Sequence, residues 1–94
     1  MLKISLEDLH AHLQSRMNQR GVTLPELEQT LSEGWEAKDC KPGTLGKVMV
    51  FAYEMEWEGQ SHLEKEVTVY YKEAEGKRVL LTVKARYGAS FPRS

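Results

Sequence analysis

Cysteine is almost absent from this sequence, since Cys40 is the only one in the chain of 94 residues. A single cysteine cannot form an intramolecular disulfide or a multi-cysteine zinc site, and this usage is typical of a reducing compartment. Long apolar runs are also missing, because no stretch of about 18 consecutive apolar residues occurs. No charged segment leads into an apolar one at the start, as a signal peptide would. We therefore expect a soluble cytoplasmic protein.

An excess of either charge is missing as well. The 13 Lys and Arg residues nearly cancel the 14 Asp and Glu residues, which leaves a formal net charge of -1. Such a chain has no general attraction for nucleic acids or membranes, so any binding of this kind must come from a local patch. The length predicts one domain, residues 1–94, with a core of modest size.

Two helices are predicted in the first third of the chain. Ser5–Asp8 is close to a capping box, and Gly21 can adopt the left-handed conformation that closes a helix. Thr23–Glu26 is a second capping signature with Pro in the first turn, and Gly34 ends that helix. We expect a helical hairpin over residues 5–34. The apolar stripes of the two helices are Leu6, Leu9, Leu13 and Met17 in the first and Leu24, Leu27 and Leu31 in the second.

After Gly34 the apolar residues alternate with a period of two, which predicts strands. Segments 35–39, 47–57, 62–72 and 77–87 are separated by short turns, so a three- or four-stranded antiparallel meander should fill residues 35–88 and leave a loose tail at 89–94. The fold class is therefore α+β, with the first helix packed on the apolar face of the sheet. In the last strand Val79, Leu81, Val83, Ala85 and Tyr87 should point inward, and Leu80, Thr82, Lys84 and Arg86 outward.

One polar ridge in the first helix suggests chemistry. His12, Arg16 and Arg20 recur at i, i+4 spacing, so they lie along one side of the helix. RNA cleavage by attack of a 2′-hydroxyl uses such groups, because an imidazole can move a proton and guanidinium groups can hold the phosphate. The alternative is structural: cations favour the C-terminal half of a helix through its dipole, and arginine stems pack on their neighbours.

Basic and aromatic side chains also share the outward side of the last two strands. They can follow a nucleic-acid backbone and stack a base. Cross-strand pairing with Glu64 and Glu66 would instead make an ordinary solvated face. The members of this group are Tyr70, Lys72, Thr82, Lys84 and Arg86.

No metal and no cofactor is expected. His10, His12 and His62 do not match the spacing of a zinc site, and the two in the helix point to different sides. Cys40 lies in a loop with no histidine near it in the sequence, so a catalytic thiol is not expected either.

The helical part carries the pattern His12-x-x-x-Arg16-Met17-x-x-Arg20-Gly21-Val22, followed by a second helix and a meander that ends in residues 82–88. It resembles a widespread bacterial family of small domains of unknown function with a His-Ala-x-x-Arg-Met-x-x-Arg-Gly opening, which is grouped with the RelE and BrnT type ribonuclease toxins. The resemblance implies two helices followed by an antiparallel sheet. It also implies a site made of His12, Arg16 and Arg20 with Lys84 and Arg86. Because the His-Ala pair occurs here at residues 10–11, either histidine can be the motif residue.

These observations lead to one first hypothesis and two alternatives. The first is a toxin-type, metal-independent endoribonuclease for single-stranded RNA, with an antitoxin-like protein as partner. The alternatives are a non-catalytic module that binds nucleic acid or protein, and a self-associating domain, such as a homodimer, that uses exposed Trp57, Tyr53 or Phe91. In the first hypothesis His12 is the general acid or base, Arg16 and Arg20 bind the phosphate, Lys84 and Arg86 hold the backbone, and Tyr70 or Tyr87 stacks a base.

Overall fold

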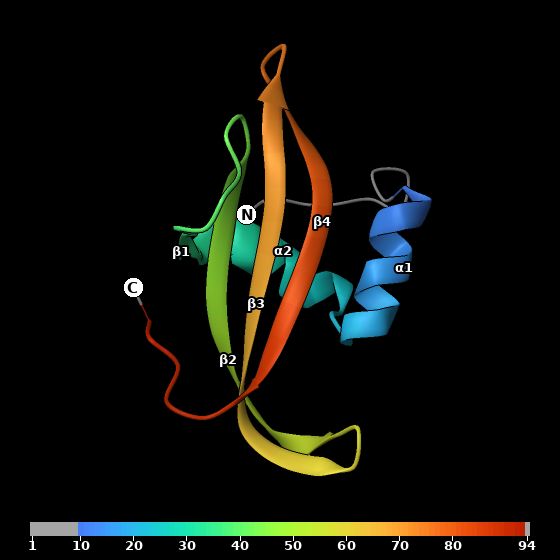
Figure 1. The fold of residues 1–94 in the computed structure, drawn as a ribbon, viewed down its shortest axis with the longest axis vertical. Helices are drawn as coiled ribbons and strands as arrows, with labels where there is room; N and C mark the ends of the chain where they lie inside the picture. Colours follow the sequence, from blue (N-terminus) through green and yellow to red (C-terminus); the bar gives the residue numbers. More distant parts are fainter. Residues whose placement is uncertain (1–9, 94) are drawn as a thin grey trace.

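The structure is a computed structural model that describes residues 10–93. Within this range two helices precede a four-stranded antiparallel sheet in which the strands follow one another in the order β1-β2-β3-β4 (Figure 1). The predicted α+β fold class and the predicted order of helices and strands are therefore confirmed. The elements are α1 (Ala11–Arg20), α2 (Leu24–Glu33), β1 (Trp35–Glu36), β2 (Leu45–Trp57), β3 (Gln60–Ala74) and β4 (Lys77–Gly88).

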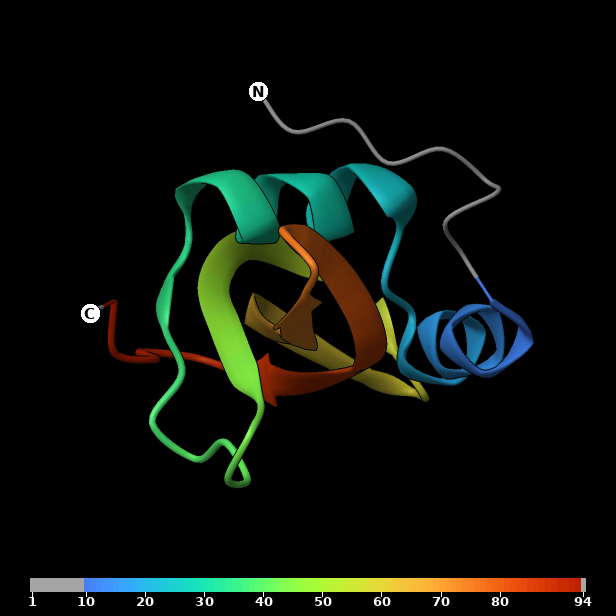
Figure 2. The ribbon, with the colours of Figure 1, turned by 90° about the horizontal axis from the view of Figure 1, so that it is seen from above.

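Both helices lie on the same side of a strongly curved sheet (Figure 2). On that face α2 contacts β2 and β3, whereas α1 packs along β4. The expected packing of the first helix on the apolar face is thus found along β4, and α2, which the short corner after α1 turns across the sheet, packs on the same face. The core between these layers consists of Leu13, Met17, Val22, Leu27, Leu31, Val67, Val69, Tyr71, Leu80 and Val83.

The first described helix begins later than predicted. His10 has an extended backbone, with φ -75 and ψ 165, and its Nδ1 accepts a hydrogen bond of 3.3 Å from the backbone N–H of Leu13. The Nε2 atom of the same ring lies 2.9 Å from the carbonyl oxygen of Leu80. The prediction of one helix that begins at Ser5 and continues through His10 is therefore wrong at His10. This residue is the N-cap of α1 and connects the helix to β4. The predicted capping box at Ser5–Asp8 lies outside the described residues.

The corner between the helices follows the sequence signals closely. Gly21 has φ 75 in the left-handed region, and a Cβ atom there would lie 2.6 Å from the ring of Trp57. Glycine is thus required for both its conformation and its small size. Thr23 and Glu26 form the capping box, with both reciprocal hydrogen bonds present.

A β-bulge changes the orientation of side chains at the start of β4. Tyr70 pairs with Thr82 while Tyr71 pairs with Leu80, which leaves Leu81 without a partner. The extra residue shifts the alternation of side chains in β4 by one position. Residues before Leu81 therefore point to the opposite face of the sheet from the one that the sequence predicts. The predicted orientations were therefore wrong there: Leu80 is in the core with 6% exposure, and Val79 is 38% exposed.

Cross-strand register divides the sheet into two faces. The face packed against the helices contains the row Phe51, Lys65 and Tyr87. The opposite face, called the open face below, contains the rows Val50, Glu66, Arg86 and Val48, Thr68, Lys84. Consecutive residues of β3 therefore contribute to opposite sides of the molecule.

Candidate functional site

The predicted ridge lies on the outer side of α1. His12 and Arg20 are exposed, and Arg16 is half-buried. The Arg16 guanidinium donates a hydrogen bond of 3.5 Å to Gln19, and among residues 10–93 neither Arg16 nor Arg20 forms an ion pair. Arg20 comes eight positions after His12, which is about 12 Å along the helix axis at about 1.5 Å per residue.

Tyr87, proposed from the sequence to stack a base, is packed against α1 and β2. Its hydroxyl donates a hydrogen bond to the carbonyl oxygen of Arg20, near the C-terminal end of α1. Its ring stacks on Trp57 with centroids 4.8 Å apart and meets Tyr53 edge-on at 5.2 Å. Burial raises the pKa of Tyr87, so the hydroxyl remains a donor. These contacts are those of a residue that holds the end of the helix.

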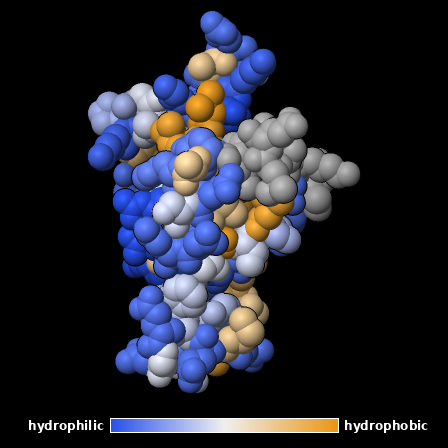
Figure 3. Space-filling view, turned by 90° about the vertical axis from the view of Figure 1, so that its right-hand side faces the viewer, coloured by the Kyte–Doolittle hydropathy of each residue, from blue (hydrophilic) through white to orange (hydrophobic). Residues whose placement is uncertain are grey.

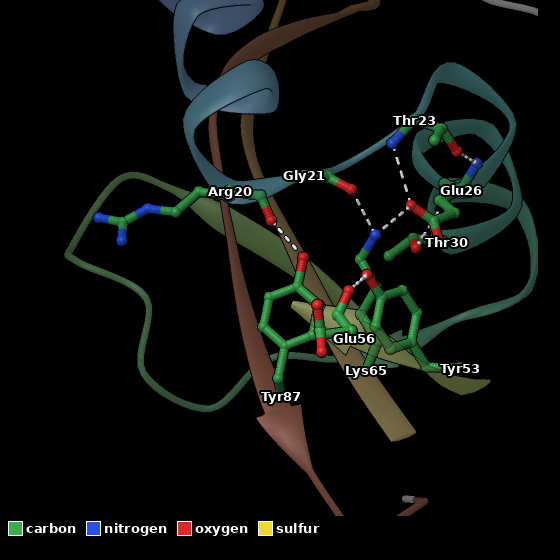
Figure 4. A network of polar contacts seen from close by, with 9 residues as sticks. All are labelled: Arg20, Gly21, Thr23, Glu26, Thr30, Tyr53, Glu56, Lys65 and Tyr87. Atoms are coloured by element: carbon green, nitrogen blue, oxygen red, sulfur yellow. Dashed lines mark hydrogen bonds and ion pairs between the residues drawn. The ribbon is translucent and has the colours of Figure 1, made fainter. Parts of the chain in front are cut away.

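A buried lysine completes this cluster (Figure 4). Lys65 is 2% exposed, and its ammonium group donates to Glu26 Oε1 at 2.7 Å and to the carbonyl oxygen of Gly21. The rings of Tyr53 and Tyr87 flank it, with centroids 5.5 and 5.6 Å from Nζ. The cluster therefore joins α1 and α2 to the sheet.

Lys65 was not among the residues predicted from the sequence, although a signal was present. It occupies an inward position of β3, two residues before the buried Val67. A lysine at such a position needs an acidic partner, and the carboxylate of Glu26 in the capping box provides it.

The open face brings together three of the residues predicted to bind substrate. Lys84 forms an ion pair of 2.6 Å with Asp39, and the Tyr70 hydroxyl donates to the same carboxylate at 2.9 Å. The Lys84 ammonium also lies 5.5 Å from the Tyr70 ring centroid. The hydrogen bond from Lys84, followed by that from Tyr70, lowers the pKa of Asp39, and the bond to Asp39 raises the pKa of Lys84. Burial raises the pKa of Tyr70.

Arg86 and Glu66 form the second charged group of this face. Arg86 Nε donates to Glu66 Oε1 at 2.8 Å, and this hydrogen bond raises the pKa of Arg86. The two partners differ in exposure: the Glu66 side chain is 11% exposed and the Arg86 side chain is 60% exposed. The guanidinium lies over Phe91 at 5.0 Å, which supports it from the tail. The carboxylate is thus fixed in the sheet, while the guanidinium remains open to solvent.

The segment after β4 is held at this face, although a loose tail was expected. Arg93 forms an ion pair of 2.6 Å with Glu64 and donates to the carbonyl oxygen of Val50 at 3.2 Å. The backbone N–H of Phe91 donates to Glu64 at 2.9 Å. The Phe91 hydrogen bond is the larger cause, before Arg93, of the lowered pKa of Glu64.

Two hollows lie beside the charged groups of the open face. The first has a volume of about 430 Å³ and the second about 380 Å³. Asp39 borders both, so the bridge from Asp39 to Lys84 and Tyr70 stands between them. The first hollow is lined by Trp35, Lys38, Glu66, Thr68, Lys84 and Arg86 among others, and the second by Lys41, Thr44, Tyr70, Leu81 and Thr82.

The structure therefore separates the predicted site residues into two groups. Tyr70, Lys84 and Arg86 meet on the open face. His12, Arg16, Arg20 and Tyr87 belong to α1 and to the opposite face of β4. Glu66 had been recognised only as an alternative partner for the basic side chains, and it is one for Arg86. Asp39 could not have been found, because the fold of its loop brings it to Lys84 from 45 residues away.

Comparisons of the chain with family models, with curated proteins and with solved structures found no match. In residues 10–93 no helix is long and apolar enough to cross a membrane. Across the same residues, His, Cys, Asp and Glu side chains form no group of three that could hold a metal ion.

Proposed function

We propose that the open face binds single-stranded RNA and that the protein is a toxin-type, endoribonuclease-like domain that acts through its side chains without a metal ion. The observation that carries this proposal is the Glu66–Arg86 pair, at 2.8 Å, at the edge of a hollow that Lys84 also lines. A carboxylate that can accept a proton then lies beside two cations that can hold a phosphate group.

In this proposal Glu66 accepts the proton of a ribose 2′-hydroxyl, and the resulting oxygen attacks the adjacent phosphorus. Arg86 moves part of its hydrogen bonding from Glu66 to the phosphate oxygens, which its exposure of 60% permits. Lys84 is a diagonal cross-strand neighbour of Glu66, about 7 to 8 Å away between backbones. Its ammonium group binds the same phosphate and gives a proton to the departing 5′ oxygen.

Tyr70 serves the neighbouring nucleotide in this arrangement. It lies one row beyond Lys84 on the open face and borders the second hollow. A ring in this place can stack a base, as proposed from the sequence, while its hydroxyl stays bound to Asp39. In this proposal the ridge of α1 takes no part in the chemical step, because α1 packs along the opposite face of β4 from Glu66, Lys84 and Arg86.

The test is cleavage of mixed-sequence RNA oligonucleotides by purified protein, with and without EDTA. Glu66→Gln and Arg86→Ala should each lower the single-turnover rate by about 100-fold or more, as loss of a charge-stabilising donor does. His12→Gln and Arg16→Gln are the matched controls and should cleave at the wild-type rate. Loss of cleavage in the two controls would place the site on α1, and no cleavage by wild-type protein would refute an enzymatic function.

One observation favours a second candidate function, a non-catalytic module that binds nucleic acid or a protein. The cations of the open face are paired with carboxylates, which makes its charge pattern mixed rather than positive; the pairs are Lys84 with Asp39, Arg86 with Glu66 and Arg93 with Glu64. A protein partner of antitoxin type can match such a pattern. Titration of a fluorescent RNA over a salt series distinguishes the two: affinity that weakens with salt, with no turnover, supports the binding module.

A further inference from the structure

The hairpin at the lower end of the sheet is an acidic arm. We use this name for residues 52–63, which end β2, turn at Glu58–Gly59 and begin β3. The arm extends beyond the body of the domain (Figure 1). It contains Glu54, Glu56 and Glu58 and neither lysine nor arginine. All three side chains are exposed, and among the described residues none forms an ion pair.

The charge of α1 is the opposite. Ala11–Arg20 contains Arg16 and Arg20 and neither Asp nor Glu. Figure 4 shows the Arg20 side chain pointing away from the polar cluster around Lys65. The chain therefore carries a basic helix and an acidic arm whose charged groups are not paired with each other within one molecule.

The arm also carries exposed apolar side chains. Met55 is 57% exposed and Leu63 is 61% exposed, the largest values among the apolar residues described as exposed. In the space-filling view the arm forms a lobe below α1 in which apolar atoms lie among hydrophilic ones (Figure 3). The residues expected to mediate self-association are less accessible, because Trp57 and Tyr53 pack around Tyr87 and Phe91 lies under Arg86.

We propose that the acidic arm of one copy binds α1 of a second copy, and that the two contacts are related by a two-fold axis. In a two-fold dimer the acidic arm of each copy contacts α1 of the other copy, so both complementary contacts form at the same time. The exposed ion pairs set orientation and partner choice, and burial of Met55 and Leu63 supplies the apolar contribution. A second copy is the partner that fits, because one chain provides both halves of the charge complementarity.

The test is a charge exchange followed by light scattering with size-exclusion chromatography over a concentration series. Variant A carries Arg16→Glu and Arg20→Glu, and variant B carries Glu54→Lys, Glu56→Lys and Glu58→Lys. Each variant alone should be monomeric at concentrations where the wild-type protein dimerises, with association weakened by about tenfold or more. A mixture of A and B should form a heterodimer, because the acidic helix of A then meets the basic arm of B and the reverse pair also matches.

Circular dichroism of A and B separately establishes that each is folded, and formation of the heterodimer is itself proof that both are. Added salt should weaken the wild-type dimer and the A–B heterodimer alike. A wild-type protein that is monomeric at every concentration overturns the proposal, and so does a mixture of A and B that stays monomeric. The open face is unchanged in both variants, so this outcome is independent of the RNA cleavage test.

Discussion

Lys65 and Glu66 are neighbours in the chain, yet they show opposite uses of charge on the two faces of one sheet. Lys65 faces the helices, is 2% exposed, and has its ammonium group enclosed by Glu26 and the carbonyl oxygen of Gly21. Glu66 faces the open side, where its partner Arg86 is 60% exposed. An enclosed pair cannot exchange its partner without opening the core, whereas an open pair can exchange its partner for a ligand.

This difference predicts that charge on the covered face contributes to stability and charge on the open face contributes to binding. Removing one member of an enclosed pair leaves the other buried without compensation, which is costly. Exposed pairs contribute little to folding, because water and salt screen them. The predictions below test this contrast, beginning with the largest expected effect.

Lys65→Met should give the largest loss of stability. The carboxylate of Glu26 and the carbonyl oxygen of Gly21 would both lose their charged donor, and we expect the free energy of unfolding to fall by about 3 to 5 kcal/mol. Urea denaturation followed by circular dichroism measures this loss. Lys72→Met, at an exposed position of the same strand, is the matched control and should change stability by less than about 0.5 kcal/mol. Equal effects at the two positions would contradict the enclosed role of Lys65.

Gly21→Ala should be the next most harmful change. It combines positive φ with a Cβ atom 2.6 Å from the Trp57 ring, so we expect a loss of about 2 to 3 kcal/mol in the free energy of unfolding. Gly59→Ala has a similar φ of +84 and no atom within 4 Å of the added Cβ, so it should cost only the conformational part, about 1 to 2 kcal/mol. In a Trp57→Leu background, the losses of stability caused by Gly21→Ala and by Gly59→Ala should become more similar. If they stay as different as before, the Trp57 ring is not the cause of the extra loss at Gly21.

His10→Ala tests the N-terminal cap of α1. The imidazole accepts the Leu13 N–H and lies 2.9 Å from the Leu80 carbonyl oxygen, so its removal should cost about 1 kcal/mol in the free energy of unfolding. His10→Asn keeps a capping acceptor and should recover part of this loss. His12→Ala, two residues further on and exposed, serves as the control and should have almost no effect on stability.

Asp39→Asn should have the smallest effect, and a pH-dependent one. The pKa of Asp39 is lowered in the folded protein by hydrogen bonds from Lys84 and Tyr70. The carboxylate therefore contributes stability above the ordinary Asp pKa of about 4, and this contribution is lost as the pH falls through the lowered value. At pH 7 the loss should be at most about 0.5 kcal/mol, because the side chain is 56% exposed.

The measurement for Asp39 is the difference in unfolding free energy between wild type and variant at pH 7 and at about pH 2. This difference in unfolding free energy should disappear at the lower pH. Glu73→Gln removes an exposed carboxylate from the same sheet, outside any described ion pair, and should show no such pH dependence. A difference that grows on acidification would contradict the assigned direction of the pKa shift.

Local sequence patterns were sufficient for most of the fold. The capping box at Thr23–Glu26, the glycine at position 21 and the alternation in three long strands all correspond to structure, because each depends on residues close in the chain. The alternation failed at Leu80, where a bulge at Leu81 exchanged the inward and outward sides, and the pairing of β2 with β3 also shifts register between Ala52 and Met55. Bulges depend on how two strands meet, and one strand read alone does not reveal that.

The candidate site was predicted only in part, for a similar reason. Lys84, Arg86 and Tyr70 were expected to be neighbours, because consecutive antiparallel strands place them side by side, and they are. Their acidic partner Asp39 comes from a loop whose path is set by tertiary contacts. Whether α1 and the open face meet could not be decided from periodicity, because it depends on the side of the sheet on which the helices pack.

The most direct test is to compare Arg86→Ala with Arg16→Ala in one experiment that measures both the free energy of unfolding and the single-turnover rate of RNA cleavage. Arg16→Ala should be about as stable as the wild type, because Arg16 forms no ion pair among the described residues. Arg86→Ala leaves the Glu66 carboxylate, which is 11% exposed, without its partner, so it should lose some stability while remaining folded. Arg86→Ala should lose about 100-fold or more in cleavage, whereas Arg16→Ala should retain the wild-type rate. Full cleavage by Arg86→Ala together with loss of cleavage in Arg16→Ala would contradict the assignment of the site to the open face.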